Sequence, residues 1–147
     1  MSTIVGTNIE VTNIKYDSDT TSMIISNAGQ VTVQGEGTAT TNLQQGLIKA
    51  FMDLDGTGTI AFNESFNISG VTDNTTGNYS PAYTNNFANV FYGWGGNGEF
   101  PNTGYSGRGP HCISDYNTTS NTRLGCGYQL GLEDCEHVRV GWWGDLA

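Results

Sequence analysis

Apolar and polar residues alternate along much of this chain, most clearly between residues 48 and 69. A period of two is typical of a β-strand that buries one face. The stretch therefore predicts two strands, and DGTG at residues 55–58 predicts the turn of a hairpin between them. Glu64 falls on the apolar parity, so we expect it at the rim of the sheet, beside a cation or at a β-bulge. The apolar positions expected to face the core are Ile48, Ala50, Met52 and Leu54, then Ile60, Phe62, Phe66 and Ile68.

The same residues also match a calcium-binding loop. DLDGTGTIAFNE, residues 53–64, places oxygen-bearing side chains, a glycine and a glutamate where an EF-hand has them. An EF-hand needs a helix after this loop, but the sequence up to Pro81 contains two glycines and several β-branched residues, which disfavour an amphipathic helix. We therefore expect a hairpin. A metal site remains the alternative, with Asp53, Asp55, Thr57 and Glu64 as its ligands.

Before this hairpin, residues 1–42 form a segment of short strands and polar turns. Two apolar runs, residues 23–25 and 31–33, flank SNAGQ and predict a second hairpin. GEGTATTN, residues 35–42, has no apolar anchor and is expected to be a linker or extended connection. Hairpins this small bury no core alone, so we expect this attachment segment to pack on other copies of itself. The rest, residues 43–147, would form one β-domain.

The last third of the chain contains two apolar runs separated by glycines. FANVFYGW predicts a strand with Phe87 and residues 90–92 in the core, and HVRVGWW predicts a closing strand with Val138, Val140 and Trp142 on one face. Residues 93–110 between them are rich in glycine and contain two prolines, which predicts a long loop.

Composition supports an all-β fold and limits the partners. Gly, Thr and Asn are abundant, a combination typical of strands joined by tight turns. We expect an N-terminal β-hairpin extension followed by a compact antiparallel β-sandwich-like domain. A net charge of −9 argues against nucleic acid and anionic lipid as partners, and the absence of a run of about 18 apolar residues argues against membrane insertion.

Three cysteines are present, and no signal peptide opens the chain. Reduced thiols in a protein assembled in a cytoplasm are therefore expected. A zinc site is the alternative, but it lacks the usual Cys-x-x-Cys pair, and we expect no cofactor. Its ligands would come from His111, Cys112, Cys126, Cys135 and His137.

Aromatic and cationic residues in and around the glycine-rich stretch are candidate receptor-binding residues. Aromatic rings stack on sugar faces, but they also pack at subunit interfaces, and both interpretations stay open. A cluster of carboxylates, Glu133, Asp134 and Glu136, is expected to be a solvated face rather than a catalytic pair, so we expect no enzyme. The candidate receptor-binding residues are Tyr92, Trp94, Phe100, Tyr105, Arg108 and His111.

One segment, KAFMDLDGTGTIAFNESFNISGVTDNTTGNYS, resembles a repeated segment of tail-fibre and related virion proteins of tailed bacteriophages, particularly marine ones. The N-terminal hairpin unit and the closing LEDCEHVRVGWWGD are also similar to parts of such proteins, whereas residues 92–121 match weakly. The matching positions are Phe51, Gly56, Thr57, Gly58, Ser65, Phe66, Asn67, Ile68, Ser69, Thr72, Asp73, Asn74, Gly77 and Tyr79.

This resemblance implies a homotrimeric virion appendage, a tail fibre or head fibre, that is assembled in the bacterial cytoplasm with other virion proteins. Its exposed end would contact a glycan or protein on the bacterial surface. A passive decoration protein of the capsid or tail, without receptor binding, is the alternative.

Overall fold

The computed structural model describes residues 13–15, 21–26, 29–34, 40–99, 111–112, 116–128 and 131–147. Nearly all regular structure in these residues is β-strand, and every strand pairing is antiparallel, so the all-β prediction is confirmed. No helix in this part of the chain is long and apolar enough to cross a membrane. The chain divides into two compact units, Met1–Gly46 and Leu47–Ala147.

The first unit is a four-stranded sheet followed by one turn of helix. Met23 pairs with Val33 and Ile25 with Val31, so the predicted hairpin around SNAGQ is confirmed. Gly29, with a φ of 75°, supplies the left-handed position of its turn. Of the predicted linker or extended connection, residues 40–42 form an edge strand, while residues 35–39 lie outside the described chain. The elements, in sheet order and then chain order, are β1 (Asn13–Lys15), β2 (Thr21–Ile25), β3 (Val31–Gln34), β4 (Thr40–Asn42) and α1 (Leu43–Gly46).

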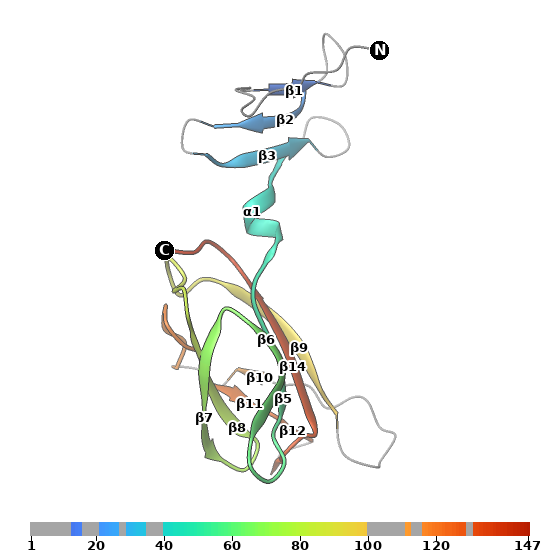
Figure 1. Ribbon diagram of the computed structural model, residues 1–147, viewed down its shortest axis with the longest axis vertical. Coiled ribbons are helices and arrows are strands. Elements are labelled where there is room, and N and C mark those ends of the chain that lie inside the picture. Colours follow the sequence, from blue (N-terminus) through green and yellow to red (C-terminus); the bar gives the residue numbers. More distant parts are fainter. Residues whose placement is uncertain are drawn as a thin grey trace. The chain divides into compact units, whose positions relative to one another are not determined.

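The second unit contains two four-stranded sheets and a short two-stranded ribbon. In Figure 1, β5, β14 and β9 run side by side in one layer, and β7 and β8 lie beside each other in a second. The first sheet has the order β6 (Ala61–Phe66), β5 (Ile48–Asp55), β14 (His137–Trp143) and β9 (Gly93–Glu99). The second has the order β10 (His111–Cys112), β11 (Leu124–Gly125), β8 (Asn78–Tyr83) and β7 (Ile68–Thr75), and the ribbon pairs β12 (Gly127–Tyr128) with β13 (Gly131–Leu132).

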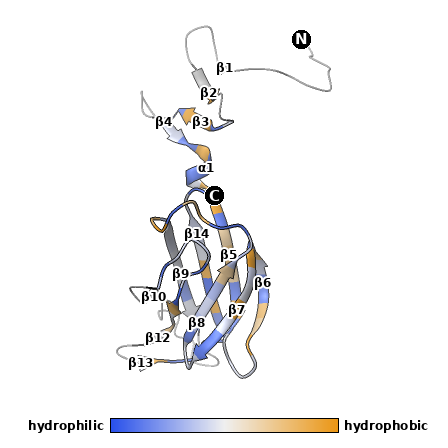
Figure 2. Cartoon of the chain, turned by 90° about the vertical axis from the view of Figure 1, so that its left-hand side faces the viewer, coloured by the Kyte–Doolittle hydropathy of each residue, from blue (hydrophilic) through white to orange (hydrophobic). Residues whose placement is uncertain are grey.

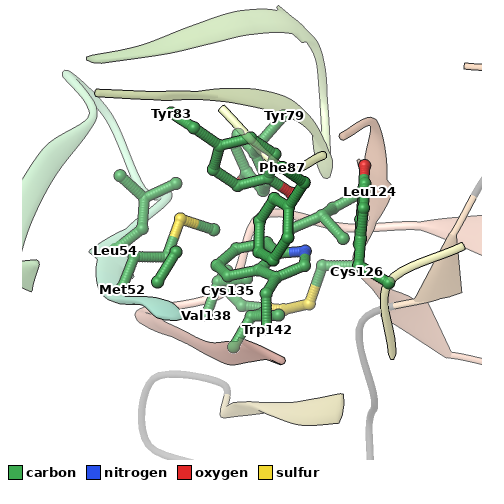
Figure 3. Close-up of a cluster of buried hydrophobic side chains, with 13 residues drawn as sticks. Met52, Leu54, Tyr79, Tyr83, Phe87, Leu124, Cys126, Cys135, Val138 and Trp142 are labelled. Carbon is green, nitrogen blue, oxygen red and sulfur yellow. A yellow bond between two sulfur atoms is a disulfide. The ribbon is translucent and has the colours of Figure 1, made fainter. Parts of the chain in front are cut away.

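Side chains from both sheets form one core, which makes the packing sandwich-like. Figure 3 shows the aromatic rings of Tyr83, Phe87 and Trp142 gathered in it. Tyr83 meets Trp142 edge to face, with ring centroids 5.7 Å apart. The predicted inward face of the closing strand is confirmed, because Val138, Val140 and Trp142 are all buried. The first strand of the predicted hairpin likewise buries Ala50, Met52 and Leu54, although Ile48 is 57% exposed.

The β5–β6 hairpin is confirmed, but a bulge changes which residues of β6 face the core. Asp53 pairs with Glu64 and Leu54 with Phe62, which leaves Asn63 as an extra residue. An extra residue shifts the side-chain alternation by one position. Phe66 is therefore 56% exposed on the outer face, and its predicted place in the core is wrong. Glu64 lies next to the bulge, one of the three positions expected for it.

Asn67 ends β6 and moves the chain into the other sheet. Its φ of 57° is a left-handed conformation, which breaks the single strand predicted to run to Ile68. Its side-chain amide donates to the carbonyl oxygens of Lys49, at 2.9 Å, and Asn85, at 3.1 Å. Its side-chain oxygen accepts from the backbone N–H of Asn85 at 2.7 Å. These bonds hold a corner that joins the two layers.

The glycine-rich stretch begins as a strand, so the prediction of a loop is wrong for residues 93–99. β9 is an edge strand that pairs with β14 from Trp143↔Gly93 to His137↔Glu99. The strand predicted for residues 87–94 is wrong for residues 87–92, which are irregular apart from a single bridge at Phe87. Phe87 and Tyr92 are buried as predicted, whereas Val90 is 44% and Phe91 89% exposed.

Cys126 and Cys135 form a disulfide within the core, visible as the yellow bond in Figure 3. The prediction of reduced thiols is therefore wrong for these two residues. The zinc alternative loses both as ligands, because only free thiolates bind zinc. Cys112 lies in β10, and its side chain is outside the described part of the structure.

Candidate functional site

The candidate site lies on the outer face of the β6-β5-β14-β9 sheet. Successive residues of a strand point to opposite faces, so Phe51 and Asp53 point outward when Ala50, Met52 and Leu54 are buried. Arg139 is paired with Asp53 across β14. In Figure 2, hydrophobic and hydrophilic segments are interspersed along the strands of this second unit.

A polar network covers one half of this face. Asp53 is its centre: His137 Nδ1 lies 2.9 Å from Asp53 Oδ1, and Asn63 Nδ2 donates to the same oxygen at 3.3 Å. Arg139 Nε donates to Asp53 Oδ2 at 3.2 Å, and Arg139 Nη1 donates to Glu99 Oε2 at 2.7 Å. The network thus joins all four strands of the sheet.

The network also sets the ionisation of its members. Burial alone would raise the pKa of Asp53. The hydrogen bonds from His137 and Asn63, with the charges of His137 and Arg139, outweigh burial and hold this pKa below its usual value. The hydrogen bond to Glu99 raises the pKa of Arg139. Asp53 is therefore a carboxylate that accepts hydrogen bonds at neutral pH.

The other half of the face is apolar. Ile48 pairs with Trp143 across β5 and β14, and both are exposed, at 57% and 42%. The Trp143 indole lies over two glycines of β9: a Cβ on Gly93 would overlap the ring, and one on Gly95 would lie 3.4 Å from it. The glycines predicted to form a loop therefore serve as a flat support for this indole.

A hollow of about 340 Å³ lies over β5 and β14, between the apolar and polar halves. Gly141 is part of its lining. A Cβ added at Gly141 would be in ordinary contact with Ile48 Cδ1, at 3.4 Å. Ile48 and Phe51 provide apolar walls, and the polar lining comes from Asp53, Glu64 and Arg139.

The structure gives the EF-hand alternative no geometric support. The residues that would form the outgoing helix, 65–81, instead form the end of β6, β7 and most of β8. Asp55 Oδ1 accepts hydrogen bonds from the Thr57 hydroxyl at 2.6 Å and the Thr57 backbone N–H at 2.9 Å, and these bonds lower the pKa of Asp55. Asp53 is held by the polar network. Among the described residues, no cluster of three or more His, Cys, Asp and Glu side chains is arranged to hold a metal ion.

Most of the predicted receptor-binding residues are not on a described surface. Tyr92 is buried, and its hydroxyl donates to the carbonyl oxygen of Thr118 at 3.0 Å, so its assignment to receptor binding is wrong. Trp94 is half-buried and packs against the core. Phe100, Tyr105 and Arg108 lie outside the described residues, and so does the side chain of His111 in β10.

The acidic turn before β14 has a structural role. Asp134 Oδ1 accepts from the backbone N–H of Gly77 at 2.6 Å and from the Tyr79 hydroxyl at 3.0 Å, so the prediction of a solvated face is wrong for this residue. Burial and the neighbouring Asp134 carboxylate together raise the pKa of Tyr79. The Tyr79 hydroxyl also lies 3.2 Å from the carbonyl oxygen of Gly56, so the acidic turn joins the two hairpins. Glu136 is exposed.

Sequence reasoning did not find the outer-face hollow. The sequence did contain a signal for the outer face. Phe51, Asp53 and Asp55 alternate with the apolar residues assigned to the core, so they had to point to the opposite side of the sheet. The bulge and the glycine-supported indole had no such signal.

Comparisons of this chain with protein-family models, with curated proteins and with solved structures found no match.

Proposed function

We propose that this chain is a structural protein of a bacteriophage virion, a fibre or fibre-like appendage. It assembles as a homotrimer through its first unit and contributes to host-surface attachment through its second. The observation that carries the proposal is that the described residues of the first unit form a sheet without a buried core. No residue whose burial is described between positions 23 and 46 is buried.

One face of this small sheet is apolar. Register pairs Met23 with Val33 and Ile25 with Val31, which places the four side chains on the same face. All four are only half-buried. Covering the apolar face of this four-stranded sheet would stabilise it, and association of identical copies would cover it.

The residues that match the phage-type segment have structural roles in this fold, which supports the proposal that the chain shares the scaffold of such proteins. Gly56, Gly77 and Tyr79 converge on Asp134 and Cys135 in the acidic turn, and Asn67 forms the corner between sheets. Gly77 has a φ of 62°, and a Cβ there would clash with backbone atoms of Cys126 and Glu133. These residues hold the hairpins and sheets together, and their contacts lie within the fold.

The mass of the full chain in solution, measured by light scattering or sedimentation, tests the proposal. We expect a trimer. Val33→Asp places a charge on the apolar face and should reduce the mass to that of a monomer. Thr40→Asp is the matched control, because Thr40 pairs with Gln34 on the opposite, exposed face of the same sheet and should stay trimeric.

A wild-type monomer would overturn the proposal.

Attachment is tested separately by binding of labelled trimer to a panel of bacterial strains. Binding restricted to particular strains is expected for an attachment protein. A trimer that binds no strain would instead indicate a passive decoration protein.

A further inference from the structure

We propose that the outer-face hollow over β5 and β14 binds a neutral, hexose-containing glycan. The proposal rests on the attachment function above and names the class of receptor that this function would require. It places the contact on a sheet face of the second unit, at residues that are not among the candidate receptor-binding residues of the sequence analysis.

The apolar half of the face suits the flat side of a pyranose ring. Sugar rings present C–H groups on one face, and aromatic side chains pack against that face. The Trp143 indole is held flat on Gly93 and Gly95, yet the residue stays 42% exposed. Its support on backbone fixes its orientation before any ligand arrives, which lowers the entropic cost of binding. Ile48, its cross-strand neighbour, extends this surface to the hollow.

The polar half suits the hydroxyl groups of the same ring. Glu64 is exposed beside the hollow, and its Oε1 accepts a hydrogen bond from the backbone N–H of Ser65 at 3.2 Å. The Glu64 carboxylate has room for further donors, whereas the oxygens of Asp53 are already used by His137, Asn63 and Arg139. Arg139 supplies N–H donors. The hollow thus combines an apolar wall with both kinds of hydrogen-bonding partner, as sites for small polar ligands do.

Charge selects the class of glycan. The carboxylates of Asp53, Glu64 and Glu99 outnumber the single guanidinium of Arg139 on this face, and Arg139 is already paired with two of them. The whole chain carries a net charge of −9. An anionic sugar would meet an excess of carboxylates among these groups, so a neutral sugar is favoured.

A second copy of the chain is a less suitable occupant. The centres of protein interfaces are depleted of charged residues. Here the Asp53–Arg139–Glu99 network crosses the middle of the face, next to the hollow. The hollow's volume of about 340 Å³ is also within the range of small-ligand pockets.

The test measures binding of the full-length protein to methyl glycosides of glucose, galactose, mannose and N-acetylglucosamine. Saturation-transfer NMR and tryptophan fluorescence are the two readouts. N-acetylneuraminic acid is the anionic comparison. We expect saturable binding of at least one neutral glycoside and none of the acid. Trp143→Ala should weaken binding by at least about tenfold. Phe91→Ala is the matched control, because Phe91 is 89% exposed and lies outside the four strands of this sheet, and it should bind as wild type.

Gly141→Val provides a second variant that fills the hollow without touching the core. The added methyl groups would project beside Ile48, so binding should be lost while the melting temperature stays near that of wild type. Loss of binding in this variant would not follow from a structural role of Trp143 alone.

Three outcomes would overturn the glycan site: no neutral glycoside binds, only the acid binds, or Trp143→Ala converts the trimer to a monomer. The third would assign the face to subunit contact. A wild-type trimer without sugar binding would leave the virion proposal standing. A monomer that binds sugar at Trp143 would leave the site standing and remove the virion proposal.

Discussion

The two units of this chain use similar hairpins but differ in what covers them. In the first unit, the β2–β3 hairpin places valine, isoleucine and methionine on one face, and all of them stay half-buried. In the second, β5 places Met52 and Leu54 on one face, and both are fully buried by the opposite sheet. The alternating pattern is the same, and the presence of a second layer makes the difference.

This difference has an energetic consequence. Full burial of a Leu or Met side chain contributes about 1.5 to 3 kcal/mol relative to exposure, and partial burial contributes correspondingly less. The second unit collects many such contributions from one closed core. The first unit collects few, so its order should depend on contacts outside the single chain. Four predictions test this contrast, and they are ordered from the largest expected effect to the smallest.

The largest effect is expected from opening a cavity in the second unit. Leu54→Ala should lower the free energy of unfolding by about 2 to 5 kcal/mol, because Leu54 is fully buried between the sheets. Ile24→Ala in the first unit should change it by less than about 0.5 kcal/mol, because Ile24 is 40% exposed. Urea unfolding followed by far-UV circular dichroism, which reports the strands of both units, measures both. Equal effects of the two variants would remove the contrast.

Reduction of the disulfide should destabilise the second unit alone. The bond between Cys126 and Cys135 closes a loop with a sequence separation of 9, and losing it should cost about 2.5 kcal/mol. Hydrogen exchange with and without reductant measures this unit by unit, and protection in β2 and β3 should stay constant. The double variant Cys126→Ala, Cys135→Ala is the control, because reductant should no longer change its exchange. If reductant left hydrogen exchange of the wild-type protein unchanged, the disulfide would be disproved.

A methyl group on Gly56 should have a smaller effect. A Cβ there would overlap the hydroxyl of Tyr79, which is fully buried and hydrogen-bonded to Asp134. We expect Gly56→Ala to lower the free energy of unfolding by about 1 to 3 kcal/mol. Gly46→Ala in the first unit is the matched control, since nothing lies within 4 Å of its added Cβ. Comparable melting temperatures of the two variants would disprove a tight contact at Gly56.

The smallest effect is expected from the acid titration of Asp53. Its pKa in the folded protein lies below its usual value of 3.8, so its ionised form stabilises the fold above that pH. This contribution is lost as the pH falls through the lowered pKa. Asp53→Asn should therefore flatten the decline of stability below pH 3.8, measured by thermal unfolding at a series of pH values. Glu136→Gln, at an exposed carboxylate, should leave the decline steep. An unchanged profile for Asp53→Asn would argue against the network.

Local patterning was enough to predict the strands and several of their faces. The parity of Ala50, Met52 and Leu54, and of Val138 and Trp142, predicted buried residues that the structure confirms. Asp-Gly and Asn-x-Gly sequences predicted two hairpins that are also observed. These features depend on neighbours within a few residues, because alternation and turn geometry are properties of the local backbone.

Only the tertiary structure decided what the rest of the residues do. The bulge at Asn63 exposes Phe66 and so reverses its parity, and the left-handed Asn67 sends the chain into another sheet. A glycine-rich stretch becomes an edge strand because β14 lies beside it and the Trp143 indole lies over it. The disulfide and the outer-face hollow likewise join residues from distant parts of the chain. A local pattern cannot encode them, because each depends on which strands become neighbours, and that is settled by packing one sheet against the other.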